Sequence, residues 1–382
     1  MKYRKMGSLG WKVSALGFGA MRLPTIKEID EESGEEKLKI DREKAIIVVG
    51  EALKYGYREK VKLVTKLPIW EVKSPKDFDI FLNKQLEKLQ TDHLDAYLIH
   101  AMDEQRFQIV KDNQIIAKME EARDKGLIKY IGFSFHDSYK TFKKIIDYFD
   151  WDLAQIQYNY LDVNYQATTK GLKYAADKGI AMVIMEPLQG GKLTREFPDV
   201  MKIIKQYNYG NTLANIGFQF LWNKPEVSVT LSGMSEKWMV KENLESVEKS
   251  GINSLTNKEE KMISELRKSF KSHNIIACTS CSYCMPCPNS VNIPRIMSFL
   301  NDFAWWGEME RERYLRLYNR FLMDEEELKK SEEKSNGKAS LCTACKECLE
   351  KCPQSINIPE MMKKGRLIFE EGGNVSEIMK RD

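Results

Sequence analysis

The chain has 382 residues, of which 42% are hydrophobic and 30% are charged, so it is too apolar for a disordered protein and long enough for one large and one small domain. Its 60 Lys and Arg and 56 Asp and Glu residues leave a net charge of +4, with both signs interspersed, so neither nucleic acid nor an anionic membrane is expected as a partner. No apolar run approaches the roughly 18 residues of a membrane span. The first residues, MKYRKMGSLG, lack the apolar centre of a signal peptide, which argues against secretion.

Apolar runs rich in β-branched residues recur through the first two thirds of the chain and predict strands. They cover residues 13–21, 62–67, 94–101, 128–135, 153–160, 180–188 and 227–234. Amphipathic segments lie between them, and residues 74–89 show helical spacing after the cap and first-turn pair Ser74-Pro75. Gly126 and Gly179 stand where helices are predicted to end, each just before the next strand.

This alternation predicts a parallel sheet, and a length of about 250 residues favours a (β/α)8 TIM-type barrel. A doubly wound sheet is the alternative, but no G-x-G-x-x-G follows the first strand. The runs number seven rather than eight. The wide gap between the first two contains a polar loop at 27–39 and a helix at 41–56, so the second strand is missing unless 45–49 forms one. Without it, the barrel is open there or closed by another element.

After about residue 251 the pattern changes to helices alone. We therefore expect a barrel domain over 1–250 and a small α-helical ferredoxin-like domain over 251–382, with a core built around metal. Trp305 and Trp306 are expected to be core or interface anchors, and the charge run 324–334 a solvated helix face.

All eight cysteines follow residue 277, in two tight runs, which favours a metal centre in a reducing cytoplasm over a disulfide scaffold. The runs are Cys278-x2-Cys281-x2-Cys284-x2-Cys287-Pro288 and Cys342-x2-Cys345-x2-Cys348-x3-Cys352-Pro353. The second has the spacing of bacterial ferredoxins, in which the cysteine before proline ligates the other cluster. We therefore predict two [4Fe-4S] clusters, one bound by Cys278, Cys281, Cys284 and Cys352, the other by Cys342, Cys345, Cys348 and Cys287. The alternative is two zinc sites of four thiolates each, although zinc ribbons usually combine separated C-x2-C pairs.

Barrel enzymes place their chemistry at the C-terminal ends of the strands. The side chains at these ends are Lys66, His100, Ser134, His136, Gln155, Asn159 and Glu186. The segments that surround them run through nearly the whole chain. They are KYRKMG, VSALGFGAMRLP, VTKLP, YLIHAMD, IGFSFHD, QIQYNYLD, MEPLQGGKL and LSGM, together with CTSCSYCMPCP. In these segments the chain resembles an aldo-keto reductase, of the subgroup that carries a C-terminal ferredoxin-type domain.

The resemblance implies NAD(P)H bound across the barrel mouth, hydride transfer to a carbonyl, and a Tyr acid supported by Lys, Asp and His. The family's Lys and His match Lys66 and His100, and its nicotinamide contacts match Ser134 and Gln155. Met185 stands where many members place an aromatic ring. Phosphate and adenosine contacts map to Leu188, Gly190, Gly191, Lys192, Leu193, Gly233, Ser235, Glu242 and Asn243.

The chain departs from the family at the second strand, because the D-T-A-x-x-Y segment that carries the catalytic Asp and Tyr is absent. Tyr55 and Tyr57 lie nearby in sequence, but at a helix end that faces the opposite pole of the barrel. Three hypotheses follow. In the first, the chain is an NAD(P)H-dependent reductase of a small carbonyl, in which Lys66 and His100 polarise the substrate and another group or water supplies the proton. In the second, it is an electron-transfer or docking protein that serves a redox partner. In the third, it is an impaired descendant of an active enzyme. Nicotinamide transfers two electrons and a cubane accepts one, and no flavin motif is found, so the clusters are expected to be structural or to serve a separate partner.

Overall fold

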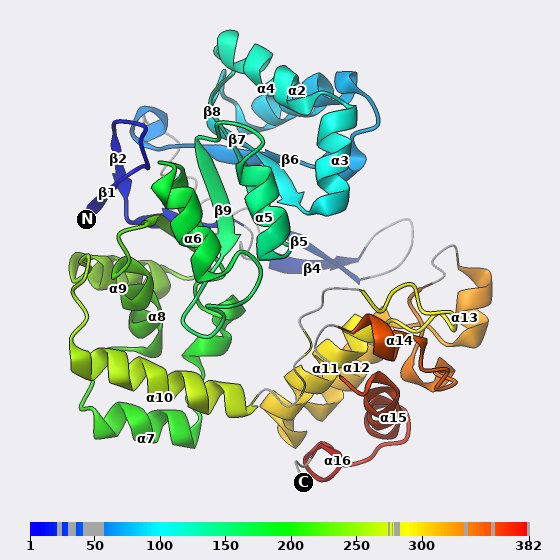
Figure 1. Ribbon diagram of the computed structural model, residues 1–382. Helices are drawn as coiled ribbons and strands as arrows, with labels where there is room; N and C mark the ends of the chain where they lie inside the picture. Colours follow the sequence, from blue (N-terminus) through cyan, green and yellow to red (C-terminus); the bar gives the residue numbers. More distant parts are fainter. Residues whose placement is uncertain are drawn as a thin grey trace. The chain divides into compact units, whose positions relative to one another are not determined.

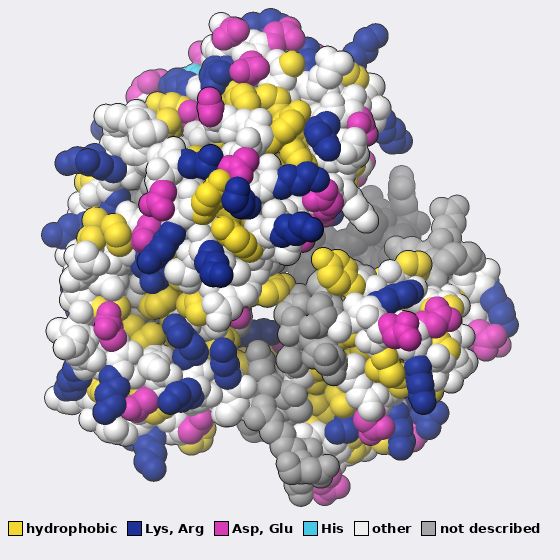
Figure 2. Space-filling view, in the orientation of Figure 1, with side chains coloured by type: hydrophobic (Ala, Val, Ile, Leu, Met, Phe, Trp, Pro, Cys, Tyr) yellow, Lys and Arg dark blue, Asp and Glu magenta, His cyan; other side chains and the backbone are white. Residues whose placement is uncertain are grey.

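The computed structural model describes residues 1–20, 25–29, 36–40, 57–273, 276, 278, 283–331, 335–352 and 356–379. The chain divides into two compact units, Met1–Arg267 and Lys268–Asp382 (Figure 1). Basic and acidic side chains are interspersed on the face shown in Figure 2, as the sequence predicts. Within the described ranges, no helix is both long enough and apolar enough to span a bilayer.

The first unit is built on a curled parallel sheet of seven strands, with helices packed around it (Figure 1). The strands are β3 (Leu16–Phe18), β6 (Val64–Leu67), β7 (Leu94–Met102), β8 (Ile128–Phe135), β9 (Leu153–Gln157), β10 (Ala181–Met185) and β11 (Val227–Ser232). Their order is β3-β11-β10-β9-β8-β7-β6, so each predicted run contributes one strand. In the part of the chain that the structure describes, β3 and β6 are the two edges, where a closed eight-stranded barrel would have another strand.

The connecting helices begin and end close to the predicted signals. They are α2 (Pro75–Leu89), α3 (Glu104–Asp112), α4 (Ile115–Asp124), α5 (Tyr139–Ile146), α6 (Thr168–Asp177), α7 (Pro198–Gln206), α8 (Leu213–Trp222), α9 (Lys237–Glu248) and α10 (Asn257–His273), with short 3-10 helices η3 (Tyr57–Lys60), η4 (Ile69–Glu71) and η5 (Gln189–Thr194). The Ser74 N–H donates to Asp77 Oδ2 at 2.8 Å at the start of α2. Gly126 (φ +73°) and Gly179 (φ +81°) follow the ends of α4 and α6 in the left-handed conformation that glycine adopts most readily.

An N-terminal hairpin, β1 (Tyr3–Lys5) and β2 (Lys12–Ser14), covers the N-terminal end of the barrel. Met6 packs there against the barrel interior, including Leu98 and Val183. The buried Arg4 anchors the hairpin, because its guanidinium donates to the carbonyl oxygens of Trp222 and Lys224, each at 2.6 Å. The run predicted as one strand from residue 13 is therefore split between this hairpin and β3.

The prediction of a polar loop at 27–39 is wrong, because β4 (Thr25–Ile29) and β5 (Glu36–Ile40) form an antiparallel hairpin. Its register places Glu28 opposite Lys37. β5 alternates apolar with charged residues and β4 is of mixed polarity, so a search for continuous apolar runs overlooks both strands. The helix predicted at 41–56, and the alternative strand at 45–49, lie outside the described residues.

The second unit is helical, as predicted. Its helices are α11 (Ile293–Trp306), α12 (Arg311–Phe321), α13 (Glu325–Lys330), α14 (Glu347–Lys351), α15 (Ile358–Phe369) and α16 (Val375–Ile378), with 3-10 turns η6 (Glu308–Glu310) and η7 (Ala339–Leu341). Tyr318 lies in the core, where its hydroxyl donates to Glu370 Oε1 at 2.7 Å and its ring stacks on Phe369 at 4.6 Å. Trp305 is 6% exposed and stacks on Phe270, and Trp306 packs against the same core, so both are core residues.

A short repeat follows the last cysteine of each run. The segment Cys287-Pro-Asn-Ser-Val-Asn-Ile-Pro leads into α11, and Cys352-Pro-Gln-Ser-Ile-Asn-Ile-Pro leads into α15. In each, the asparagine side chain accepts from a first-turn N–H, Asn292 from Arg295 and Asn357 from Glu360. α11 and α15 pack against each other, and Cys287 and Cys352 both pack against the same core.

Candidate functional site

A cavity of about 710 Å³ opens at the C-terminal ends of the strands in the first unit. Twelve of the residues predicted for the barrel site line it: Lys66, His100, Ser134, Gln155, Met185, Leu188, Gly190, Gly191, Gly233, Ser235, Glu242 and Asn243. Lys192 and Leu193, both within the described chain, are not on its wall, and Leu193 is fully buried. Thr194, Glu196 and the exposed Trp238 also line the cavity, although nothing in the sequence pattern singled them out.

Lys66 and His100 enter this cavity from neighbouring strands, since β6 pairs with β7 in parallel. Burial, together with the nearby positive charge of Lys66, lowers the pKa of His100 to about 4. Burial also lowers the pKa of the Lys66 ammonium. At neutral pH, His100 is therefore an uncharged imidazole beside a lysine that loses its proton more readily than a solvated one.

Ser134 fixes the strand end that carries His100. The register of β7 against β8 shifts between Ile99 and Met102, and Ala101 adopts a positive φ of 55°. The Ala101 N–H donates to Ser134 Oγ at 2.8 Å, and Ser134 is 1% exposed. This bulge sets the position of His100, and the Ser134 hydroxyl proton can still be donated to a ligand in the cavity.

Trp70 is a neighbour of His100 that the sequence did not reveal. It lies in η4, and its ring centroid is 4.9 Å from that of His100, at an interplanar angle of 51°. The Arg106 guanidinium lies 5.6 Å from the Trp70 ring centroid. An aromatic ring against one side of the imidazole limits its motion and its access to water.

Asp162 joins β9 to the loop of η5. Its Oδ2 accepts hydrogen bonds from Gln157 Nε2 (3.2 Å), Asn159 Nδ2 (3.5 Å) and Gln189 Nε2. Gln189 opens the loop whose Gly190 and Gly191, at φ of +68° and +95°, line the cavity. Side chains are absent from these two positions, so a ligand can approach the backbone closely.

Elsewhere on the cavity wall, polar side chains are held by one another. Gln155, 6% exposed, has its Nε2 atom 3.2 Å from Met185 Sδ. Asn243 donates to Ser232 Oγ at 3.0 Å. The Thr212 hydroxyl donates to Glu242 Oε1 at 2.6 Å. The cavity is therefore lined by oriented amides, hydroxyls and a carboxylate.

The segment that follows the predicted helix 41–56 lies at the other end of the barrel. Arg58, beside Tyr57, bonds Asp95 Oδ2 at 3.0 Å and the His93 carbonyl oxygen at 2.9 Å, at the start of β7, whereas His100 lies near its end. No tyrosine occurs among the described residues that line the cavity. Tyr55 lies outside the described residues.

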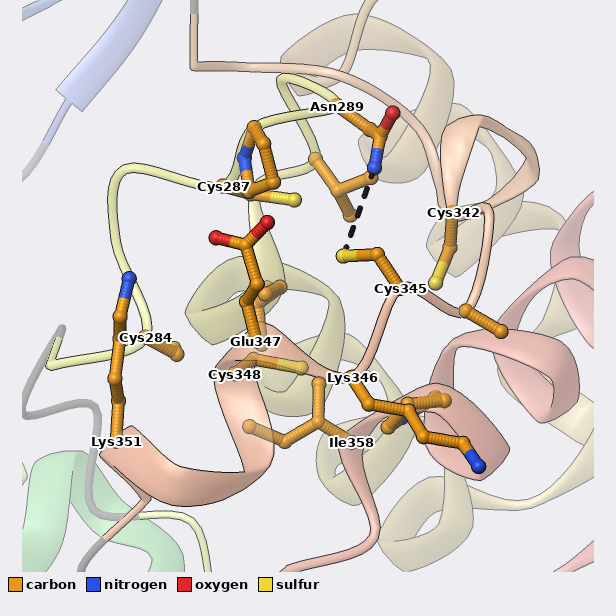
Figure 3. A pocket seen from close by; sticks show the side chains of 15 residues that line it. Cys284, Cys287, Asn289, Cys342, Cys345, Lys346, Glu347, Cys348, Lys351 and Ile358 are labelled. Atoms are coloured by element: carbon orange, nitrogen blue, oxygen red, sulfur yellow. Dashed lines mark hydrogen bonds between the residues drawn. The ribbon is translucent and has the colours of Figure 1, made fainter.

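In the second unit, cysteines from both runs line one small pocket (Figure 3). They are Cys284 and Cys287 from the first run and Cys342, Cys345 and Cys348 from the second. Burial, with neighbouring thiols that include Cys287, raises the pKa of Cys348 to about 11. Cys278 and Cys352 are partly buried, and Cys281 lies outside the described residues.

These thiols are suitable ligands for iron or zinc, and the pocket brings Cys287 to the second run, as the crossed assignment requires. No group of three or more His, Cys, Asp or Glu side chains within the described ranges is arranged to hold a single metal ion.

The first unit is thus a parallel, barrel-like sheet with a cavity at its strand ends, and the second is a helical domain with a thiol-lined pocket. Residues 41–268 match the aldo/keto reductase family, and residues 277–357 match the 4Fe-4S dicluster domain. The chain therefore belongs to the aldo/keto reductase family and carries a C-terminal 4Fe-4S dicluster domain.

Similar proteins agree with this assignment. "Probable aldo-keto reductase 1" of Glycine max is 27% identical over 155 residues, covering 34% of this chain and 44% of that relative, so the chain spans less than half of the relative's length. Aldo-keto reductase AKR11C1 from Bacillus halodurans, in its holo form, matches with a TM-score of 0.53 and 24% identity, over 70% of this chain and 96% of that one. The thermostable aldo-keto reductase Tm1743, solved with the inhibitor epalrestat, matches with a TM-score of 0.55 and 23% identity, over 70% of this chain and 100% of that one. At this identity the two structures show the fold alone.

Proposed function

We propose that the first unit catalyses NAD(P)H-dependent reduction of a small aldehyde or ketone in the cytoplasm. The observation that carries this proposal is the cavity that brings Lys66 and His100 together with Ser134, Gln155 and the Gly190–Gly191 loop. The family membership supports it independently. In domain terms, we propose that the barrel unit, expected over 1–250 and compact over Met1–Arg267, holds this chemistry, and that the unit expected over 251–382 and compact over Lys268–Asp382 is a ferredoxin-type domain.

The residues of the cavity suit a nicotinamide cofactor. Ser134 and Gln155 would hold the carboxamide, since a hydroxyl and an amide can pair with its oxygen and nitrogen. Met185 would pack on the ring. The phosphates and adenosine would be held by the predicted residues that line the cavity, Leu188, Gly190, Gly191, Gly233, Ser235, Glu242 and Asn243. When bound, the reduced nicotinamide supplies a hydride.

Lys66 and His100 would act on the carbonyl oxygen. The ammonium and the imidazole N–H both donate hydrogen bonds, so they stabilise the negative charge that develops on that oxygen. Because burial lowers the pKa of Lys66, we propose that its ammonium gives the proton to the forming alkoxide and is then reprotonated from solvent. His100, neutral because its pKa is about 4, would orient the oxygen without competing for the proton.

The test is NADPH and NADH oxidation by anaerobically purified protein with a panel of aldehydes and ketones. Lys66→Met should lower kcat/KM by about 10²-fold or more, since positioned acids contribute roughly 10² to 10⁴-fold. Lys62→Met is the matched control, because Lys62 bonds Asp95 at the opposite end of the barrel and should leave turnover within about twofold. Wild-type protein that binds NADPH but turns over no carbonyl would contradict the proposal.

We further propose that the dicluster domain holds two [4Fe-4S] clusters with the crossed ligation given above. Support comes from the pocket that places Cys287 beside Cys342, Cys345 and Cys348, although Cys284, assigned to the other cluster, also lines it. Iron and sulfide analysis decides between this proposal and two zinc sites: eight irons per chain are expected for two cubanes.

A second candidate function is electron transfer to a redox partner protein, favoured by the match of residues 277–357 to a 4Fe-4S dicluster domain. EPR spectra of dithionite-reduced protein test it. Reducible clusters in a protein without carbonyl turnover would favour this function, and clusters that dithionite cannot reduce would contradict it.

A further inference from the structure

The side-chain amide of Asn289 connects the two cysteine runs. Asn289 lies two residues after Cys287, in the first run's Cys-Pro turn. Its Nδ2 atom is 3.9 Å from Cys345 Sγ in the second run and 2.9 Å from Thr343 Oγ1 (Figure 3, where the dashed line marks the contact with sulfur). The two N–H bonds of one amide can serve both acceptors. Thr343 therefore orients the amide toward the sulfur of Cys345.

The turn that carries Asn289 is fixed by its backbone. The Ser290 N–H donates to the Cys287 carbonyl oxygen at 2.9 Å, and the Gly337 N–H donates to the Ser290 carbonyl oxygen at 2.8 Å. Pro288 restricts the backbone between Cys287 and Asn289. The same turn thus presents both a thiol and an amide donor to the pocket of the second run.

Cys345 is also the most accessible thiol of that pocket, exposed where Cys284, Cys287, Cys342 and Cys348 are partly buried. Hydrogen bonds to cluster sulfurs and solvent exposure both tune the potential of an iron–sulfur cluster. Because Cys345 is exposed, the Asn289 amide provides a fixed hydrogen-bond donor where exchanging water molecules would otherwise donate.

We propose that Asn289 raises the reduction potential of the [4Fe-4S] cluster bound by the second cysteine run, through an N–H···S hydrogen bond to Cys345. This rests on the proposed cluster ligation. One electron, from dithionite in the test below, takes the cluster from the 2+ to the 1+ state and adds negative charge to its thiolate sulfurs. A hydrogen-bond donor stabilises the reduced state more than the oxidised state, so its loss lowers the potential.

The contacts of Asn289 make this effect specific to one cluster. Both its amide contacts are with residues of the second run, Thr343 and Cys345. Gln354, at the corresponding position of the repeat, lies outside the described residues. Changes at Asn289 should therefore shift one reduction step and leave the other in place.

The experiment is an EPR-monitored redox titration of the full-length, cluster-loaded protein, with iron and sulfide measured for each variant. Asn289→Leu keeps the size and removes the donor, so one potential should become more negative. Asn289→Asp also adds a negative charge and should lower the same potential further, whereas Asn289→Gln, which retains an amide, should restore part of the shift. Ser340→Ala is the control, because Ser340 is exposed two residues before Cys342 and bonds Glu370 through its backbone N–H.

Asn289→Leu and Asn289→Asp proteins with full iron and both potentials unchanged would overturn this inference and leave the ligation intact. Equal shifts of both steps, or the same shift in Ser340→Ala, would also overturn it. Wild-type protein that holds zinc instead of iron would overturn the cluster assignment and this inference together. If the Leu variant does not load, the Asp and Gln variants carry the comparison.

Discussion

The hydrogen bonds that Asp162 accepts predict that this residue, which lies outside the cavity wall, affects the affinity for the cofactor. Asp162→Asn keeps the shape of the side chain but removes its charge, while Gln157, Asn159 and Gln189 remain as donors. A hydrogen bond to a charged group contributes about 1.5–3 kcal/mol and a neutral one about 0.5–1.5 kcal/mol. Of the three bonds to Asp162, only that from Gln189 reaches the Gly190–Gly191 loop, so we expect a loss of about 1 to 1.5 kcal/mol in binding, which is roughly a five- to tenfold rise in Kd.

The assay is a fluorescence titration of NADPH at fixed ionic strength, with thermal unfolding of each variant measured in parallel. Asp147→Asn is the matched control, because the Asp147 carboxylate also meets three partners, Lys143, Tyr174 and Lys178, but lies on the α5–α6 surface. The control should leave Kd unchanged. An Asp162→Asn protein that binds within twofold of wild type, or a control that loses as much affinity, would refute the reasoning.

Three further predictions follow from contacts in the two units. Arg4→Met should lower Tm, measured by calorimetry, by about 5 °C or more. Two buried carbonyl oxygens lose their donor, and each loss costs roughly 1–3 kcal/mol of the free energy of unfolding. A change in Tm under about 1 °C would contradict this prediction. The pKa of His100 is lowered to about 4, so the unfolded chain binds more protons between that value and about 6.5. This contribution makes the fold less stable as pH falls through that window, and His100→Asn should flatten the difference in urea stability between about pH 5.5 and 7.5. If ligation is crossed, Cys287→Ser and Cys342→Ser should leave the same residual EPR spectrum, and Cys352→Ser a different one; matching spectra for Cys342→Ser and Cys352→Ser would contradict it.

The seven strands could be predicted because a buried parallel strand is apolar on both faces. Capping residues such as Ser74-Pro75 and Gly179 mark the ends of the helices that connect these strands. The β4–β5 hairpin could not, because it joins two short strands of mixed polarity and leaves no continuous apolar run. Only β5 shows the alternation of a strand, and the stretch is short enough to occur in loops.

The candidate site likewise contains residues that the sequence predicts and contacts that it does not. Lys66, His100, Ser134 and Gln155 stand at strand ends, and the topology of a parallel barrel brings such ends together. The contacts of Trp70 with His100 and of Asp162 with Gln189 join positions 30 and 27 residues apart. Neither pair has a spacing that local structure would impose, so only the packed barrel reveals them.

The location of Lys66 links the fold to the chemistry. In the family that the chain resembles, the second strand carries the catalytic Asp and Tyr, and it would lie between β3 and β6, the edges of the described sheet. Among the described strands β6 is an edge strand, and we propose that Lys66, at its C-terminal end, supplies the proton in place of the family's Tyr. A lysine with a lowered pKa can do so while it is protonated, which makes turnover fall as pH rises through its pKa. A reductase whose turnover did not depend on the charge of Lys66 would instead keep its rate across that pH range, so the pH profile reports whether the Lys66 ammonium takes part in the reaction.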